Sequence, residues 1–345
     1  MQIKSRFRLS NLPGSVFVFI FVFCIASFWV PRFFSPGNLS TLLLQASILM
    51  ILSTGMALSL ICGNIDLSMG GNLSMCGVII ALCLNRGMHA LPAIGIGMVC
   101  GALFGFLNGI FVTKMKVPSF IATFGSMGIA QSIANTLSER RTLYWDAGPQ
   151  TRILNFLGGD ILRIEFGSQA SMILTVPFLV LLTICVLAFV IFVFKKTVLG
   201  SYIYAIGENE ETARLCGIDT TKWKISVFMI SGALASIAAL LVLIRTNSMQ
   251  PTSGDGLEFQ AVVAAVLGGN SLKGGKGDLY GALFGALTLY TVRSSLTLAG
   301  IDTSVTMIVI GAVLVVGMIL NELAVRHEKK LLGRPAELYG EKGHE

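Results

Sequence analysis

Long stretches of apolar residues, separated by short polar breaks, dominate the chain. Four of them, 13–30, 39–62, 171–194 and 225–244, contain 18 or more residues with almost no charge. A helix needs about 20 apolar residues to cross the hydrocarbon of a bilayer. The pattern therefore predicts transmembrane helices rather than the amphipathic elements of a soluble domain.

Together, the apolar stretches and the residues that interrupt them predict ten membrane spans. We expect an all-α polytopic protein with a membrane domain at 1–325, an outer loop at about 138–170 and a tail at 326–345. The eighth span is short and rich in glycine and alanine. The ten spans are expected at 13–33, 41–62, 68–85, 91–113, 117–137, 171–194, 223–244, 257–270, 279–298 and 302–322.

Composition argues against a soluble protein with an unusually large core. The chain is 54% hydrophobic and 12% charged, whereas soluble domains are about 25% charged. Too little polar sequence remains to cover a surface that faces water. The first apolar stretch follows three basic residues, as in a secretory signal, but it shows no small-x-small cleavage pattern. We therefore interpret it as an uncleaved helix.

The positive charges indicate the orientation of the chain. If the N-terminus is cytoplasmic, ten spans return the C-terminus to the same side, so both termini are expected in the cytoplasm. The inside segments 1–12, 114–116, 195–224, 271–278 and 323–345 then hold 17 of the 25 lysines and arginines. Such an excess is typical of cytoplasmic loops. The net charge of +7 thus reflects topology, and no nucleic-acid partner is expected.

One short sequence occurs twice, with opposite predicted directions. Gly-Ala-Leu-Phe-Gly is found at 101–105 and again at 281–285. In the ten-span arrangement the two copies cross the membrane in opposite senses, as expected for two inverted halves of five spans each. Small residues at two separate helix contacts explain the repeat equally well.

No catalytic or cofactor-binding pattern is present. The three histidines lie in a loop and in the tail, and the seven cysteines show no C-x-x-C spacing. The glycine-rich stretch 268–277 lacks the spacing of a phosphate-binding loop, because Asn270 and Gly277 stand where Gly and Ser/Thr are needed. We expect a non-catalytic protein without cofactor or metal, so any ATPase must be another polypeptide.

Two polar interruptions of the apolar pattern are candidates for a transport pathway. At 63–70 (GNIDLSMG), Gly63 and Asn64 allow the helix to unwind, and a carboxylate at the depth of Asp66 usually lines a cavity or pairs. The alternative is a turn in which Asp66 caps the next helix. At 250–259 (QPTSGDGLEF), the alternative to substrate contact is a loop and a helix start favoured by its acidic residues.

The cytoplasmic stretch 205–218 (AIGENEETARLCGI) predicts a short helix that ends at Gly217. Glu210 and Arg214 have the i,i+4 spacing that supports a helix. Apolar residues such as Leu215 offer contact to something outside the bilayer. From spacing alone, a solvated loop helix is the favoured interpretation.

Four motifs, in order along the chain, resemble permeases of the ribose/galactose/autoinducer-2 branch of ABC importers. The resemblance covers G-x-I-D-L-S-x-G at 63–70, F-I-A-T-x-G at 120–125, G-x-N-x-x-x-A-R-x-x-G-I at 207–218 and the stretch 250–277. Departures occur at Glu208 and Cys216, where small residues or Ser are common, and at Asn64, where small residues or Glu are familiar.

The resemblance implies a membrane-spanning subunit that moves a monosaccharide or a related small polar substrate across a bacterial inner membrane. Implied partners are two cytoplasmic ATPase subunits, a periplasmic binding protein, a second identical or similar permease chain and the lipid bilayer. The coupling segment, about 200–218, would contact the ATPase through Gly207, Glu208, Asn209, Glu211, Ala213, Arg214 and Gly217. The expected pathway residues are Asn64, Asp66, Ser68, Thr123, Gln250 and Glu258.

Three other functions remain open from the sequence. An ion-coupled secondary transporter would need intramembrane carboxylates or histidines, and Arg293 is the one charged residue placed plainly within a predicted span. A permease of the same superfamily for branched-chain amino acids or nucleosides is the second. A membrane-embedded enzyme is the third, and it lacks any nucleophile–base or metal constellation.

Overall fold

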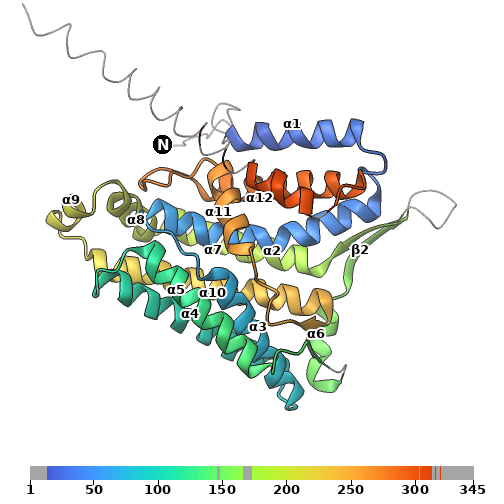
Figure 1. The fold of residues 1–345 in the computed structure, drawn as a ribbon, viewed down its shortest axis with the longest axis horizontal. Helices are drawn as coiled ribbons and strands as arrows, with labels where there is room; N and C mark the ends of the chain where they lie inside the picture. The colour runs from blue at the N-terminus through green and yellow to red at the C-terminus, as the bar shows by residue number, and fades with distance from the viewer. Residues whose placement is uncertain are drawn as a thin grey trace, which may run out of the picture.

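The computed structural model describes residues 14–145, 148–165, 173–302, 304–312, 315 and 319. Long helices run roughly side by side and make up most of this part of the chain (Figure 1). Four are long and apolar enough to cross a membrane: α2 (Pro36–Ile61), α4 (Ala90–Thr113), α7 (Phe178–Lys196) and α10 (Thr220–Thr246). The chain is therefore a mostly helical, polytopic membrane protein.

Five further helices fall close to other predicted spans. They are α1 (Gly14–Trp29), α3 (Met69–Asn85), α5 (Ser119–Leu137), α11 (Leu257–Leu267) and α12 (Leu279–Leu298). Helical residues 304–312 stand at the start of the tenth predicted span. The rest of that span, apart from 315 and 319, and the predicted tail at 326–345 lie outside the described residues, as does the N-terminal segment 1–13.

Two predicted spans need correction. The eighth, expected at 257–270, is the 11-residue helix α11, about 16 Å long at 1.5 Å per residue. The helix alone is therefore shorter than the roughly 30 Å of hydrocarbon. Gly256, in a left-handed conformation, precedes it, and Gly268 caps its end. The sixth, expected from 171, begins only at Phe178, since Ile173–Pro177 forms a strand.

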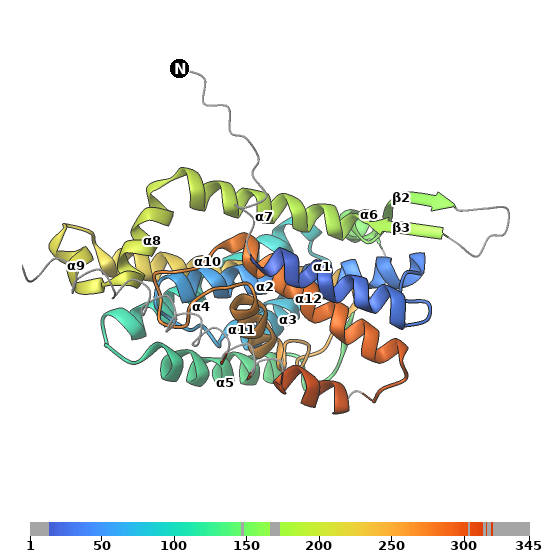
Figure 2. The same ribbon diagram turned by 90° about the horizontal axis from the view of Figure 1, so that it is seen from above.

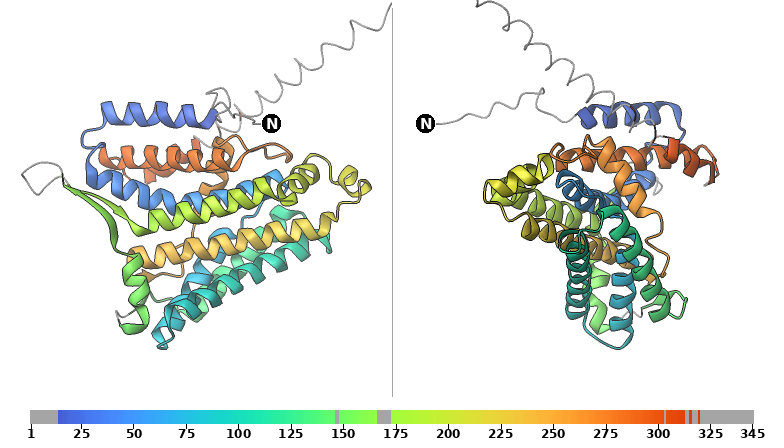
Figure 3. Two further views of the ribbon diagram at one scale, coloured as in Figure 1. Left: turned by 180° about the vertical axis from the view of Figure 1, so that it is seen from behind. Right: turned by 60° about the vertical axis from the view of Figure 1, so that its left-hand side comes forward.

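Short strands also correct the all-α expectation. In the predicted outer loop, β2 (Asp160–Glu165) pairs antiparallel with β3 (Ile173–Pro177), after the short helices η2 (Pro149–Thr151) and α6 (Arg152–Leu157). A second ladder joins β1 (Leu143–Tyr144) to β4 (Ser248–Met249). The β2–β3 hairpin projects from one end of the molecule, and α9 (Glu210–Leu215) lies at the opposite end in Figures 1 and 3.

Helix α2 forms the centre of the bundle. Every residue from Ile51 to Ile61 is buried, and α10, α11, α12 and α7 all pack against the helix. In Figure 2 the short helix α11 lies in the middle of the molecule, while α7 and α5 lie along opposite edges. Apolar side chains on those edges, such as Phe189 and Phe124, are exposed and face the region that lipid would occupy.

Glycines spaced four residues apart bring α4 and α10 into close contact. Gly97, Gly101, Gly105 and Gly109 all lie on the face of α4 that packs against α10, where a side chain at Gly105 would overlap the carbonyl oxygen of Phe228. Small residues at helix contacts allow this approach and favour association of transmembrane helices. The two α-helices therefore pack backbone against backbone.

Both copies of the repeated sequence Gly-Ala-Leu-Phe-Gly allow close packing against the main chain of another helix. In the first copy, Gly101 contacts the backbone of Gly232 in α10; in the second, Gly281 and Gly285 of α12 contact the backbone of Gly268 and Ala264 at α11. Two helix contacts thus account for both copies. The inverted arrangement of two five-span halves stays a prediction.

We expect Gly105→Leu to disrupt the α4–α10 contact. The new side chain overlaps the Phe228 carbonyl, and overpacking of this kind typically costs about 1–3 kcal/mol. The matched control is Gly95→Leu, on the same helix, where an added Cβ meets nothing within 4 Å. Thermal unfolding in detergent should show a lower midpoint for Gly105→Leu than for the control. Equal midpoints would contradict the packing described here.

Candidate functional site

The predicted coupling segment forms two short helices, where the sequence analysis expected one. Helix α8 (Val198–Glu208) is capped by Thr197, whose Oγ1 accepts a hydrogen bond from Leu199 N at 3.3 Å. Asn209 is extended and starts α9, with its Oδ1 accepting from Thr212 N at 2.8 Å. The extended Asn209 thus separates the helices, and α9 ends before Gly217, which has a φ of +84°.

The two helices present a mixed polar and apolar surface. The expected coupling residues Glu208, Asn209, Glu211, Arg214 and Gly217 are exposed, whereas Ala213 is buried and Gly207 is half-buried. Leu215, at the end of α9, is 81% exposed. The exposed surface of α8 and α9 thus combines charged groups with an apolar side chain.

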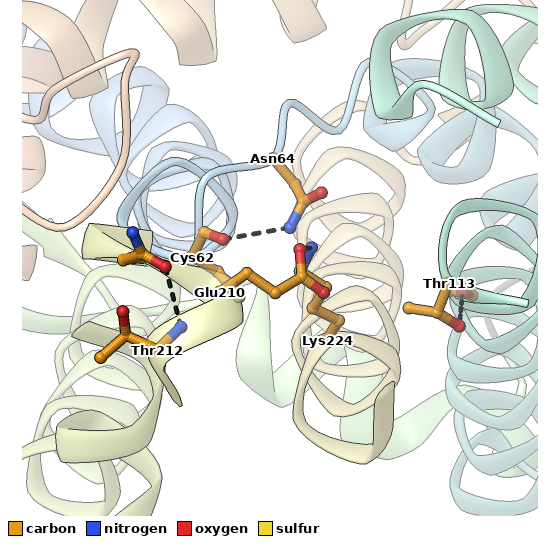
Figure 4. A network of polar contacts seen from close by, with 8 residues as sticks. Cys62, Asn64, Thr113, Glu210, Thr212 and Lys224 are labelled. Carbon is orange, nitrogen blue, oxygen red and sulfur yellow. Dashed lines mark hydrogen bonds and ion pairs between the residues drawn. The ribbon is translucent and has the colours of Figure 1, made fainter. Parts of the chain in front are cut away.

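An ion pair connects α9 to the long helix α10. The carboxylate of Glu210 binds the ammonium of Lys224, whose side chain is only 13% exposed. The ion-pair partner of Glu210 is therefore Lys224, whereas the sequence spacing suggested Arg214. Figure 4 shows this pair beside Cys62 and Asn64, at the end of α2. The charges of Glu210 and Lys224 are close enough to act on the Cys62 thiol. Three segments therefore meet here.

Glycines from three of the sequence motifs meet where α8 packs against the end of α2. A side chain at Gly207 would overlap the carbonyl oxygen of Ile61, the last residue of α2. That same oxygen accepts a hydrogen bond from Gly275 N at 2.9 Å. Gly274 in turn lies against Gly63 and Gly207. We call Ile61, Gly63, Gly207, Gly274 and Gly275 the glycine junction, because its contacts are made between main chains.

A tyrosine strengthens the attachment of α8 to the glycine-rich loop 268–278. Tyr204 Oη donates a hydrogen bond to the carbonyl oxygen of Gly277 at 2.7 Å. Burial, assisted by the nearby Asp278, raises the pKa of the Tyr204 phenol, so the group stays neutral and keeps its proton for this bond. The coupling segment is thus held by both main-chain contacts and a side-chain donor.

Between α2 and α3 the helical hydrogen bonding is interrupted at 62–68, inside the bundle. Side chains from α5 replace the missing partners. Ile65 N donates to Ser119 Oγ at 3.2 Å, and Leu67 N donates to Thr123 Oγ1 at 3.1 Å. The Thr123 hydroxyl also lies 2.8 Å from the carbonyl oxygen of Ser119. Thr123, an expected pathway residue, therefore supports the unwound segment.

Asp66 is the centre of a buried polar network. Its Oδ1 accepts hydrogen bonds from Ser68 N at 3.1 Å and Ser68 Oγ at 2.6 Å, while its Oδ2 accepts from Ser231 Oγ of α10 at 2.5 Å. Asn108 of α4 donates to Ser68 Oγ at 2.8 Å. The carboxylate thus binds Ser68, the residue that precedes α3, rather than N–H groups within the helix, and it links this segment to α10.

Glu258 lies against the start of the same helix α3. It is 4% exposed, and its Oε1 accepts from Gly256 N at 3.2 Å. Its other oxygen lies so close to Gly70 that a side chain there would overlap it. Gly254 N donates to Ser74 Oγ at 2.9 Å, which fixes the preceding loop on α3. The motif at 250–259 therefore packs onto the motif at 63–70.

The six expected pathway residues thus divide into two groups. Asn64, Asp66, Ser68, Thr123 and Glu258 are all buried in the bundle. Gln250 is exposed, and its main-chain N–H donates to Ser253 Oγ at 3.2 Å, in the loop after β4. The structure brings the first group to the neighbourhood of the α3 start and leaves Gln250 outside it.

Sequence reasoning missed Ser231, Asn108 and Lys224. Each is a polar residue in or at the edge of an apolar helix, the kind of position where a polar side chain needs an internal partner. Ser231 and Asn108 also stand directly beside glycines of the α4–α10 contact, Gly232 and Gly109. This adjacency was a usable signal, because close helix contacts bring such side chains within hydrogen-bonding reach.

Comparison with known proteins gives a consistent match over most of the chain. The family model described as "Branched-chain amino acid transport system / permease component" matches residues 38–318. The "Ribose import permease protein RbsC" of Escherichia coli (strain K12) is 33% identical over 307 residues, covering 89% of this chain and 92% of the relative.

Two further relatives extend the range of substrates named. The "Fructose import permease protein FrcC" of Rhizobium meliloti is 31% identical over 324 residues, covering 92% of this chain and 88% of the relative. The "Autoinducer 2 import system permease protein LsrC" of Escherichia coli (strain K12 / DH10B) is 31% identical over 280 residues, with 81% and 77% covered. No solved structure matches the chain.

We expect Thr123→Val to destabilise the protein although the two side chains have nearly the same shape. The substitution leaves the buried Leu67 N–H without its acceptor, which typically costs about 1–3 kcal/mol. The control is Thr113→Val, because the Thr113 hydroxyl only donates to the Gly109 carbonyl within α4. Thermal unfolding in detergent measures both. A Thr123→Val midpoint no lower than that of the control would argue against a supporting role for Thr123.

Proposed function

Because the chain belongs to the family described as "Branched-chain amino acid transport system / permease component", we propose that it is the permease subunit of an ATP-driven importer for a monosaccharide or a related small polar substrate. The three relatives above are named for import of ribose, fructose and autoinducer 2. As a permease component the chain is non-catalytic. ATP hydrolysis belongs to a separate subunit.

One observation carries this proposal: the glycine junction connects the exposed helices α8 and α9 to the interrupted segment that holds Asp66. Gly207 contacts the last carbonyl of α2, and Gly63 opens the interruption. A push on α8 is therefore transmitted to main chain three to five residues before Asp66. This arrangement suits a subunit that converts movement of a cytoplasmic partner into rearrangement inside the bundle.

We propose a partner for each end of the molecule. We assign two ATPase subunits to the exposed coupling residues of α8 and α9, on the cytoplasmic side of a bacterial inner membrane. A periplasmic binding protein would dock at the opposite end, where the β2–β3 hairpin and α6 lie (Figure 2). A second permease chain, identical or similar, would complete the importer, as the family resemblance implies. Both termini are proposed to be cytoplasmic.

For the pathway itself, we assign the substrate-facing role to the polar groups around the start of α3. Asp66, Ser68 and Asn108 supply carboxylate, hydroxyl and amide groups in one connected network. Such groups match the hydroxyls of a sugar. Rocking of α10 would change the Ser231–Asp66 bond and so expose the network. Thr123 and Glu258 would act by supporting the main chain. Asn64 would line the cytoplasmic end of the pathway, and Gln250 would line its outer entrance.

A second function is favoured by one specific observation. Asp66 and Glu258 are carboxyl groups buried among helices, and intramembrane carboxylates often bind the coupling ion in secondary transporters. The ion-coupled alternative therefore differs from the ATP-driven proposal in its energy source rather than in the residues it would use.

The energy source can be tested in proteoliposomes that hold the permease, its ATPase subunits and the binding protein. We expect uptake of labelled ribose or fructose to need ATP on the ATPase side and to continue without any proton or sodium gradient. A proton- or sodium-coupled transporter would show the reverse dependence. Transport that collapses with the gradient while ATP is maintained contradicts the ATP-driven proposal. An assembled complex that moves neither sugar contradicts ribose and fructose as substrates.

The coupling assignment can be tested by cross-linking. We expect cysteines introduced as Glu208→Cys or Glu211→Cys to cross-link to the ATPase subunit in the active complex. The background needs Cys216→Ser, because Cys216 is an exposed native thiol in the same segment. Arg86→Cys, exposed at the C-cap of α3, is the matched control at the other end. Absence of cross-links at both positions in an active complex would rule out the assignment.

A further inference from the structure

A groove on the outside of the bundle lies between α7, α12 and α2. It has a volume of about 410 Å³, and its lining is mostly apolar, with Ile184, Ile191 and Phe192 from α7, Met50 from α2 and Leu283 from α12. Ile184 and Phe192 are 55% and 62% exposed. Because α7 is the most apolar of the candidate spans, the groove opens toward lipid rather than toward water.

One end of this groove is basic. Lys195 and Lys196, in the last turn of α7, line it together with Tyr280. Lys195 Nζ lies 3.5 Å from Asp278 Oδ1 and 4.1 Å from the centroid of the Tyr280 ring. Asp278 therefore balances Lys195, and the exposed Lys196 leaves the end of the groove with a net positive charge.

The basic end lies on the side of the membrane predicted to be cytoplasmic, because α8 and the coupling segment follow Lys196 directly. Lysines alone are expected at the cytoplasmic end of any span, where they also compensate the negative end of the helix dipole. What distinguishes Lys195 and Lys196 is the apolar groove that leads up to them, with an aromatic ring at the same level. Basic pockets between helices on this side favour anionic lipid head groups.

We propose that this groove is a binding site for an anionic phospholipid of the inner leaflet. An acyl chain lies along Ile184, Ile191 and Phe192, and the phosphate binds Lys196 together with the protons of Lys195 that do not point to Asp278. A zwitterionic lipid fits less well, since its own cationic group would be brought toward Lys196. Charge complementarity thus selects phosphatidylglycerol-like lipids over phosphatidylcholine.

Native mass spectrometry of the full chain in detergent tests the selectivity. Titration should show more bound phosphatidylglycerol than phosphatidylcholine, and Lys196→Gln should weaken phosphatidylglycerol binding by about fivefold, the effect of one basic residue near an anionic surface. Lys114→Gln, at the end of α4 and outside the groove, is the control. Equal losses in the two variants, or displacement of the lipid by millimolar inorganic phosphate, would overturn the proposal.

Fluorescence in bilayers tests the position. In Phe192→Trp, brominated phosphatidylglycerol should quench the added tryptophan more strongly than brominated phosphatidylcholine does, and Lys196→Gln should remove the difference. Phe189→Trp is the matched control, because Phe189 is exposed on the same helix but does not line the groove; both lipids should quench it equally. If neither lipid quenches Phe192→Trp, protein rather than lipid covers the groove and the proposal fails.

Discussion

The structure depends on one constraint: main-chain polar groups inside a bilayer must find partners within the protein. Residues 62–68 interrupt helical hydrogen bonding in the middle of the bundle. Their main-chain N–H groups find acceptors in the preceding helix, in α5 and within the segment itself. Asn64 N returns to the Ser59 carbonyl at 2.8 Å, Leu67 N reaches Thr123 and Ser68 N reaches Asp66. The positions of α5 and of the Asp66 carboxylate follow from this need.

Close main-chain packing is the second consequence. The glycine junction and the α4–α10 contact place carbonyl oxygens where any side chain would overlap them. Contacts of this type cannot be relieved by a change of rotamer, because no side chain lies between the two main chains. Displacement of α8 must therefore move the end of α2, the loop at 268–278, or both. Rigid contact at the junction is thus the physical basis of the coupling proposed between the peripheral α8 and the buried segment.

The sequence indicated the helices better than the site. Apolar length alone located α2, α4 and α10 to within a few residues, since crossing a bilayer demands long apolar helices. It misjudged α11 and the start of α7, because composition does not reveal where a glycine or a strand replaces helix. The motifs located Asp66 and Thr123, but their partners Ser231 and Asn108 come from other helices, and a single sequence does not show which helices touch.

The charge balance around α3 bears on the kind of substrate that such a site can accept. Helices α3 and α11 both begin near Gly70, and their positive N-terminal ends are accompanied by the buried carboxyl groups of Asp66 and Glu258. An isolated pair of helix N-termini would attract anions. Here the protein's own carboxyl groups already compensate the positive ends of the two helices. The neighbouring hydroxyl and amide groups remain as the polar surface. A neutral, hydroxyl-rich molecule therefore suits this region better than an anionic one.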